Sequence, residues 1–347
     1  MVRMGLVGYG LAGAEFHAPL ATAAGLELAA VVSSDPGRRQ RASRHLRGVT
    51  LHDDLAGLLA AGGVDVIVLA SPTGAHAGQA HAVIDAGVPV VVDKPLAVDA
   101  ETALAVVDHA VQAGVPLTVF QNRRYDSEFA TLTDVVRSRA VGAVHRLEMR
   151  WERWRPEPKL RWREQLPAEQ GGGLLLDLQA HLVDGAVRLF GPVDSVFATV
   201  DARTTRSEDD TFLVCRHASG VVSHLTASSL SAAPGPRVRL LGNAAAYLSA
   251  QFPGEPVTLP DLADADADHC GWLYRGAQRE PVRRVRSEQA DFYRGLAAAL
   301  AAHDRQAAMP VDPRDAVHVL AVLDAARESA RGHRVVEVLA PGRPPSP

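Results

Sequence analysis

Three glycines directly after the first apolar run constrain the fold more than any other feature of this chain. Residues 2–7 (VRMGLV) are typical of a short buried strand, GYGLAG follows at once, and residues 14–24 are predicted to be helical. In this context G-x-G-x-x-G is the dinucleotide-binding signature. Gly8 allows the turn, Gly10 lets a pyrophosphate approach, and Gly13 lets helix and strand pack closely. The free N–H groups of the helix start would then face the phosphates.

The end of the second predicted strand, at residues 26–32, indicates which cofactor is preferred. An acidic residue there would bind the ribose 2′-hydroxyl of NAD. This chain instead has Ser33 and Ser34, with arginines from Arg38 onwards. Small hydroxyls and guanidinium groups suit a 2′-phosphate, so we predict NADP. NAD remains the alternative if Asp35 turns inwards and binds the ribose.

Alternation of helices and apolar strands continues to about residue 120. Helices are predicted at 36–46, 53–61, 75–86 and 99–113, and strands near 49 and at 64–69, 88–92 and 116–120. Strands that are apolar throughout and separated by helices predict a parallel sheet covered on both faces. We therefore expect an α/β protein whose residues 1–122 form a Rossmann dinucleotide-binding domain.

Ligands bind at the carboxyl ends of strands in such sheets, and three of these ends carry polar residues. Together with the first turn and the end of the second strand they give the predicted cofactor contacts: Gly8, Tyr9, Gly10, Leu11, Ala12, Gly13, Ser33, Ser34, Arg38, Ser71, Pro72, Thr73, His76, Asp93, Lys94 and Gln121.

Lys94 follows a fully apolar strand and precedes Pro95, an unusual position for a surface lysine. At the open edge of the sheet it would face the nicotinamide end of the cofactor. There it could polarise a substrate hydroxyl as a cation or act as a base after a downward shift of its pKa. The alternative is a lysine that pairs with Asp93 in a turn.

The pattern changes after Tyr125, and residues 123–340 are predicted to form a second, substrate-binding α+β domain. Its strands have one polar face, which favours an open, largely antiparallel sheet. We expect strands at 144–154, 195–203, 211–217, 221–229 and 237–241, and helices at 127–139, 287–302 and 313–331. Residues 263–268 (ADADAD) lack the glycine and distal glutamate of an EF-hand and are predicted to be a solvated loop. Residues 341–347 are predicted to be a disordered tail.

Asp177 and His181 follow a run of glycines at 171–173 and are four residues apart. In a helix both would project from one face, one turn apart. A carboxylate beside an imidazole can orient the ring and stabilise its protonated form, as a proton-transfer pair requires. By itself such a pair is more often a solvated surface pair than a catalytic one.

Composition narrows the class of protein. Apolar residues make up 47% and charged residues 22%, with a formal net charge of −4, so no basic field favours nucleic acid. The two cysteines, Cys215 and Cys270, have no metal-ligand spacing and fit a reducing compartment. We see no signal peptide and no membrane-spanning run, and we expect a cytoplasmic protein without a metal.

Four motifs together resemble the Gfo/Idh/MocA family of NAD(P)-dependent oxidoreductases over residues 4–339. They are GYGLAG, ASPTGAH at 70–76, DKP at 93–95 and GGGLLLDLQAHLVD at 171–184. FHAP (16–19), VVVDKP (90–95), FQNRRYDSEF (120–129) and RWRE (161–164) are similar to the subgroup that includes the NADP-dependent scyllo-inositol dehydrogenases.

This resemblance implies hydride transfer between a secondary alcohol and C4 of a nicotinamide, with an inositol, sugar or related cyclic polyol as substrate. It implies that His181 takes the hydroxyl proton, that Asp177 orients it or binds a neighbouring hydroxyl, and that Lys94 lowers the barrier electrostatically. It also implies a homodimer or homotetramer formed through the second domain's sheet. The substrate contacts would be Asn122, Arg123, Tyr125, Trp162, Arg163, Asp177 and His181, although Trp162 and Arg163 could instead serve domain packing and ion pairing.

Two positions depart from the family pattern. Gln179 stands where the family usually has glycine, and its side chain could narrow the pocket or alter substrate choice. Asp93 replaces the more frequent glutamate and keeps the charge. Two other functions remain open on this fold: a reductase of keto-sugars, imines or biliverdin-type substrates, and a non-catalytic NAD(P)-sensing regulator.

Overall fold

The computed structural model describes residues 1–159, 161–250 and 259–339, which form two compact units. One comprises residues 1–122 and 289–317, and the other comprises 123–288 and the chain from 318 onwards. The predicted tail at 341–347 lies outside the described residues.

A parallel six-stranded sheet forms the centre of the first unit, in the order β3-β2-β1-β4-β5-β6. Its strands are β1 (Arg3–Val7), β2 (Glu27–Val32), β3 (Thr50–His52), β4 (Val66–Leu69), β5 (Val90–Asp93) and β6 (Leu117–Phe120). Every residue of β4, β5 and β6 is buried, as expected for strands covered on both faces. The predicted Rossmann sheet is confirmed.

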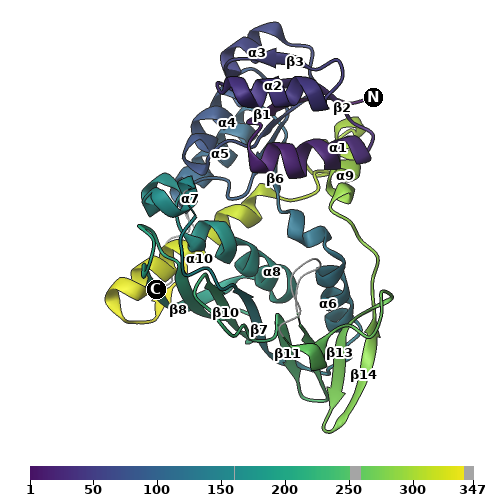
Figure 1. The fold of residues 1–347 in the computed structure, drawn as a ribbon, viewed down its shortest axis with the longest axis vertical. Helices are drawn as coiled ribbons and strands as arrows, with labels where there is room; N and C mark the ends of the chain where they lie inside the picture. Colours follow the sequence, from purple (N-terminus) through teal and green to yellow (C-terminus); the bar gives the residue numbers. More distant parts are fainter. Residues whose placement is uncertain (160, 251–258, 340–347) are drawn as a thin grey trace. The chain divides into compact units, whose positions relative to one another are not determined.

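Helices connect these strands: η1 (Gly13–His17), α1 (Ala18–Ala23), α2 (Pro36–His45), α3 (Leu55–Ala61), η2 (Thr73–Ala75), α4 (His76–Asp85), α5 (Ala100–Ala113) and, after β6, η3 (Asn122–Tyr125). Helices α4 and α5 lie side by side (Figure 1). Asp35, Asp54 and Asp99 each accept a hydrogen bond from the backbone N–H three residues later, so a side-chain N-cap begins α2, α3 and α5.

Residues 289–317, which the sequence analysis assigned to the second domain, pack within the first unit. Helix α9 (Ala290–Ala301) lies beside α1 and buries Phe292 and Tyr293 against Phe120 of β6 (Figure 1). Beyond it, the side chain of Gln306 bonds both backbone groups of Leu117. The apolar periodicity of α9 predicts a helix, but it does not say which sheet the helix covers.

The second unit is built on a nine-stranded sheet in the order β14-β13-β12-β11-β7-β10-β9-β8-β15. Its strands are β7 (Val144–Glu152), β8 (Val193–Asp201), β9 (Asp210–His217), β10 (Val222–Ser228), β11 (Val238–Gly242), β12 (Ala246–Ser249), β13 (His269–Arg275), β14 (Gln278–Arg283) and β15 (Val336–Glu337). Only β7 and β10 pair in parallel, so the expected largely antiparallel sheet is confirmed. The sequence analysis did not identify β12 to β15.

The helices of the second unit are α6 (Ser127–Arg137), α7 (Trp162–Gln165), η4 (Ala168–Gln170), η5 (Leu175–Gln179), α8 (Ala180–Phe190), η6 (Pro260–Leu262) and most of α10 (Pro313–Gly332). Helix α8 packs on β7 and β10, and the residues of β10 alternate between half-buried and buried from Val222 to Ala227. The hydroxyl of Ser329 on α10 accepts a hydrogen bond from the backbone N–H of Ala198, which ties α10 to β8.

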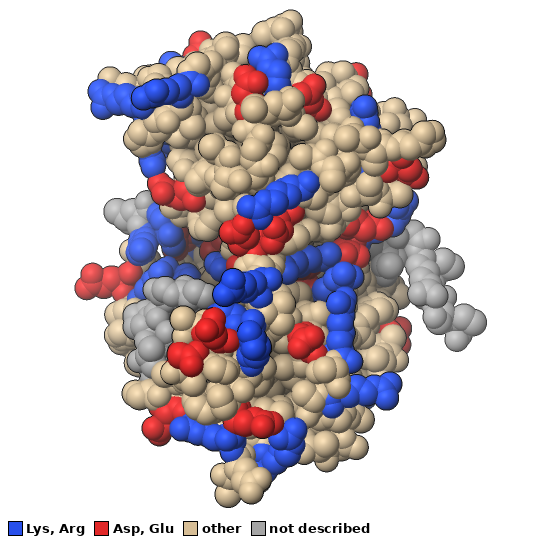
Figure 2. Space-filling view, turned by 90° about the vertical axis from the view of Figure 1, so that its right-hand side faces the viewer, with Lys and Arg blue, Asp and Glu red and all other residues tan. Residues whose placement is uncertain are grey.

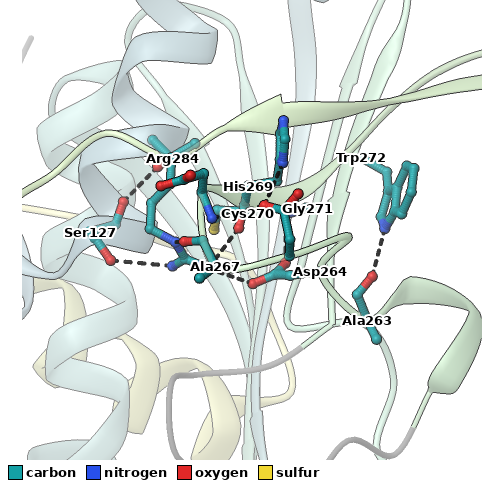
Figure 3. A network of polar contacts seen from close by, with 12 residues as sticks. Ser127, Ala263, Asp264, Ala267, His269, Cys270, Gly271, Trp272 and Arg284 are labelled. Carbon is teal, nitrogen blue, oxygen red and sulfur yellow. Dashed lines mark hydrogen bonds and ion pairs between the residues drawn. The ribbon is translucent and has the colours of Figure 1, made fainter.

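The acidic segment 263–268 is an ordered loop around Arg284, not simply a solvated one (Figure 3). The guanidinium of Arg284 donates to the carboxylate of Asp264 and to the carbonyls of Ala267 and His269. It also donates to the hydroxyl of Ser127 at the start of α6. An internal guanidinium therefore pairs with one carboxylate of the segment and connects the loop to α6.

Charged side chains of both signs are interspersed on the face shown in Figure 2, in line with the small net charge. Within residues 1–159, 161–250 and 259–339, no helix is long and apolar enough to cross a membrane. In the same ranges, no group of three or more His, Cys, Asp or Glu side chains is arranged to hold a metal ion.

We predict that Arg284→Ala lowers the free energy of unfolding by about 2 kcal/mol, because Asp264 and two carbonyls lose a charged donor in a partly buried site. Arg283→Ala, at an exposed neighbouring position, is the matched control and should cost under about 0.5 kcal/mol. Chemical denaturation followed by circular dichroism measures both. Equal losses in the two variants would contradict the role given to Arg284.

Candidate functional site

The glycine turn after β1 is confined on one side and open on the other. Gly8 has φ +98°, and a Cβ there would lie 2.6 Å from the carbonyl oxygen of Ala70 after β4. A Cβ on Gly13 would overlap the carbonyl oxygen of Gly8. At Gly10 a Cβ would meet only the guanidinium of Arg38, at 3.8 Å. Two glycines are therefore required by the fold, and the third leaves space above the turn.

That space fits the pyrophosphate of a dinucleotide. The backbone is helical from residue 11 to residue 23 without interruption, so the unpaired N–H groups of the helix start lie at the turn. Tyr9, within the turn, is 2% exposed, so its side chain is packed inside the first unit. Leu11 is 57% exposed beside Ala12, an unusual position for a large apolar side chain unless a ligand covers it.

The end of β2 shows what Asp35 and Arg38 do. The carboxylate of Asp35 accepts a hydrogen bond from the backbone N–H of Arg38 at 2.9 Å and thereby caps α2. This hydrogen bond and the nearby arginines hold the pKa of Asp35 below its ordinary value. Ser33 is buried and accepts from the N–H of Asp35, whereas Ser34 is exposed. The exposed guanidinium of Arg38 lies beside Gly10.

His76 holds together the loops that follow β4 and β5. Its ring is 1% exposed, with Nδ1 2.9 Å from the carbonyl of Pro95 and Nε2 2.8 Å from that of Ser71. Burial lowers the pKa of His76, against the opposing effect of the Asp93 carboxylate. Pro72 caps the short helix η2, and Thr73 within it is buried. His76, one of the predicted cofactor contacts, therefore connects the loop after β4 to the loop after β5.

Asp93 belongs to a buried polar cluster that the sequence analysis did not find. One carboxylate oxygen accepts the backbone N–H of Lys94 at 2.8 Å, and the other lies 3.7 Å from Nε2 of His17. The Nδ1 of His17 is hydrogen-bonded to the hydroxyl of Tyr293 at 2.6 Å. Burial alone would raise the pKa of Asp93, but His17, with Lys94 and His76, brings it below its usual value. An anionic carboxylate thus fixes the backbone at Lys94.

The motif FHAP could have indicated this cluster, because a histidine within an otherwise apolar helix start requires a polar partner if it is buried. Nothing in the sequence pairs it with Tyr293, which is 276 positions away. The ring of His17 also lies 4.3 Å from that of Phe120. The cluster therefore forms only when α9 covers this part of the first unit.

Gln121 and Asn122 follow β6 and are both buried. The carboxamide of Asn122 donates to the side chain of Gln289 at 3.0 Å, so it serves packing within the first unit. Among the described residues, Oε1 of Gln121 is enclosed without a hydrogen-bond partner. An orphaned acceptor at the carboxyl end of a strand fits a ligand N–H, such as the carboxamide of a nicotinamide.

In the second unit, Asp177 lies in the π-helical turn η5. Its carboxylate is 3.1 Å from Nε of Arg163, whose guanidinium also stacks on Trp162, 4.4 Å from the ring centre. Asp177 and Arg163 line a cavity with about 400 Å³ of empty space, part of it open to solvent. Arg153, Arg155 and Arg161 line it too. We call this the Asp177 cavity.

His181 lies one residue after the start of α8, with its ring 5.5 Å from that of Trp151 on β7. It lines a second cavity of about 490 Å³, also partly open, which we call the His181 cavity. Arg123 lines the same cavity, binds Asp126 at 2.9 Å and stacks on Trp151. Tyr125 is half-buried, and its carbonyl accepts from the hydroxyl of Ser287.

Asp177 and His181 line different cavities of the second unit. Asp177 lies in the π-helical turn formed by residues 175–179, and His181 lies in the α-helix that follows it. That the two act as a proton-transfer pair stays a prediction. Nothing in the sequence marks the π-helical turn apart from the preceding glycines.

Gln179 also differs from expectation, because it does not narrow either cavity. Its side chain is fully buried, and its amide donates to the Thr211 hydroxyl and the Leu225 carbonyl. It therefore connects η5 to β9 and β10. A glutamine is accommodated here because two adjacent strands present oxygens to it.

Comparisons with known proteins agree along nearly the whole chain. The family model described as "Oxidoreductase family, NAD-binding Rossmann fold" matches residues 2–121, and the GFO/IDH/MocA C-terminal domain matches residues 129–248. The scyllo-inositol 2-dehydrogenase (NADP(+)) IolW of Bacillus subtilis is 26% identical over 96% of this chain and 95% of its own. The uncharacterized oxidoreductase YdgJ of Escherichia coli is 31% identical over 98% and 99%.

Solved structures show the same fold. An NAD-binding protein from Listeria innocua superposes with a TM-score of 0.82, at 23% identity over 97% of this chain and 96% of that one. An oxidoreductase from Agrobacterium radiobacter, in complex with NAD+, L-tartaric acid and magnesium, gives 0.79 at 18% identity, over 97% and 98%.

We predict that Gly10→Ala and Gly13→Ala fail in different ways. Gly10→Ala faces open space, so it should fold normally but weaken NADPH binding at least about tenfold by keeping the pyrophosphate away. Gly13→Ala should be destabilised by about 2 kcal/mol or more, because its Cβ overlaps the Gly8 carbonyl. Fluorescence titration with NADPH and thermal unfolding separate the two effects. Normal NADPH affinity in Gly10→Ala would contradict the assigned site.

Proposed function

Because the chain belongs to the Gfo/Idh/MocA family of NAD(P)-dependent oxidoreductases, we propose that it transfers a hydride between NADP and a secondary alcohol or ketone of a cyclic polyol. Inositols and sugars are the substrate class. The observation that carries the proposal is the near full-length similarity to an NADP-dependent scyllo-inositol 2-dehydrogenase, together with Lys94 at the end of β5.

Three residues carry the proposed chemistry. When bound, the cofactor supplies a hydride acceptor at C4 of its nicotinamide. His181 removes the proton from the substrate hydroxyl, and the ammonium of Lys94 stabilises the negative charge that develops on that oxygen. The carboxylate of Asp177, held by Arg163, accepts a hydrogen bond from a neighbouring hydroxyl and orients the ring.

NADP is the proposed cofactor because of two residues at the start of α2, Asp35 and Arg38. The carboxylate of Asp35 is occupied as the N-cap, which disfavours its use as a ribose ligand. The guanidinium of Arg38 lies beside Gly10, on the side where the adenosine phosphates of a dinucleotide would lie. A charged donor in that position favours a 2′-phosphate.

We also propose that the chain assembles as a homodimer or homotetramer through the face of the second unit's sheet that points away from α8. Phe212 and His224 lie on the half-buried positions of β9 and β10, with their rings 5.9 Å apart. Aromatic side chains at such positions are typical of interfaces.

The proposal predicts that Lys94→Ala and His181→Ala each lower kcat at least about 100-fold on an oxidised polyol. NADPH affinity should change little, because neither residue belongs to the glycine turn. The test is absorbance of the reduced nicotinamide over a panel of inositols, aldoses and ketoses, with NADPH binding measured separately.

Lys159→Ala, at an exposed position, is the matched control and should keep wild-type turnover. Loss of NADPH binding with normal kcat in the Lys94 or His181 variant would contradict the assignment. A wild-type protein that binds NADPH but turns over no member of the panel would favour a sensor.

Arg38→Ala should lower the ratio of kcat/KM for NADP over NAD at least about tenfold, since the 2′-phosphate loses a charge-assisted contact. Arg44→Ala lies on the exposed far end of α2 and should leave the ratio unchanged. Steady-state kinetics with both cofactors at a fixed polyol concentration measure it. An unaltered ratio in Arg38→Ala would rule out this residue as the determinant.

A further inference from the structure

Glu128 places a carboxyl group in the His181 cavity, and the proposed reaction does not use it. It is the second residue of α6 and lines the cavity together with His181. The residue is half-buried, but its Oε1 is fully enclosed and has no hydrogen-bond partner among the described residues. An enclosed carboxyl oxygen without a partner is costly, and native structures retain such groups mainly where a ligand satisfies them.

Two hydrogen bonds hold the first turns of α6, the helix that carries Glu128. Ser127 accepts a hydrogen bond from Arg284, which also organises the acidic loop (Figure 3). Thr131, one turn further along α6, accepts from the backbone N–H of Val285. These bonds fix the backbone position from which the Glu128 side chain reaches the cavity.

Burial also decides the charge of this group. It raises the pKa of Glu128 to about 8, because the desolvation of a carboxylate outweighs the nearby guanidinium groups of Arg237 and Arg123. Asp126 and Asp264 raise the pKa further. At neutral pH the carboxyl therefore keeps its proton and is a hydrogen-bond donor.

Two arginines of the cavity are paired with its aspartates, and Arg237 donates to the backbone carbonyl of Arg150. Arg124 of η3 donates two hydrogen bonds to Asp184 of α8, at 2.9 and 2.6 Å, and Arg123 binds Asp126. An apolar wall of Phe129, Leu132, Met149 and Val238 completes the lining. Paired charges, an apolar wall and an uncharged donor fit a neutral ring that carries hydroxyl groups.

We propose that Glu128 is a substrate-binding residue whose carboxyl O–H donates a hydrogen bond to a hydroxyl or carbonyl oxygen of an uncharged polyol in the His181 cavity. This proposal rests on the proposed function and adds to it a specificity-determining residue from α6. Glu128 holds the substrate ring while His181 handles the proton, so its removal weakens binding more than it slows the chemical step.

Kinetics of two variants test the contact. Glu128→Ala should raise the polyol KM at least about tenfold, with a smaller change in kcat, because a donor to a bound oxygen is lost. Glu128→Gln keeps an uncharged donor of similar shape and should restore KM to within about fivefold of wild type. Asp134→Asn, an exposed carboxyl on the same helix, is the matched control and should leave KM unchanged. Equal KM in wild type and Glu128→Ala would overturn the proposal.

The pH dependence gives a second test. In the wild type, kcat/KM for the polyol should fall as the pH rises through about 8, because Glu128 then loses its donor proton and becomes an anion. Glu128→Gln should lack this fall, since an amide does not titrate. A fall that persists unchanged in Glu128→Gln would assign it to another group and overturn the proposed donor role.

A third measurement needs no turnover. The folded state keeps the Glu128 proton between the usual glutamate pKa and about 8, whereas the unfolded state loses it. Stability is therefore greatest below the usual pKa and falls until the pH passes about 8. Urea midpoints of the wild type should decline relative to those of Glu128→Gln between pH 5 and 8. Parallel midpoints would overturn the assigned protonation state, whether or not the protein oxidises a polyol.

Discussion

The first unit depends on one close contact between backbone segments. Gly13 lies so close to the carbonyl of Gly8 that it tolerates no Cβ, and Gly8 tolerates none because it lies against the carbonyl of Ala70. This brings the start of the first helix and the end of β4 to the same edge of the sheet as the end of β1. The helix start, Ser71 and Lys94 are then fixed relative to a single surface, because β5 pairs with β4 in register. The open position at Gly10 is a by-product of the same packing.

Much of this could be predicted from residue patterns, since a parallel sheet buried on both faces requires apolar strands and tight turns. The apolar residues of 64–69 and 88–92 predict buried strands, whichever strands lie beside them in the sheet. By contrast, the π-helical turn at 175–179 arises where the chain after Gly173 packs against Glu208, a contact 33 positions away for Leu175. Local propensity does not include that contact, so the π-helical turn that holds Asp177 could not be predicted.

The same reasoning explains the other differences. Residues 289–317 have the apolar periodicity of a helix, and only the packing of Tyr293 against His17 assigns them to the first unit. The sequence of the acidic loop is typical of a solvated or cation-binding segment. Its partner Arg284, which binds Asp264, lies 20 positions away in the sequence. Gln179 was expected to face a pocket, but its amide donates to oxygens of Thr211 and Leu225 on two strands. In each case the deciding partner is distant in sequence and polar, and hydrophobic periodicity does not report it.

Two carboxyl groups have pKa values shifted in opposite directions, although burial raises the pKa of both. Asp93 stays anionic because His17 faces it and the backbone N–H of Lys94 donates to it. Glu128 keeps its proton because the desolvation of its carboxylate outweighs the guanidinium groups near it. The Asp93 anion also interacts with the charge of Lys94, the residue proposed for an electrostatic role.

Residue usage supports this view of Lys94. Of the 36 lysines and arginines, only Lys94 and Lys159 are lysines, so arginine serves nearly every structural ion pair of the chain. A guanidinium binds carboxylates in a planar fork, whereas an ammonium is a compact point charge that can approach a single oxygen. A lysine after β5 therefore suits the proposed ligand, which carries one developing negative charge on a single oxygen. That is the group a hydride transfer from an alcohol creates.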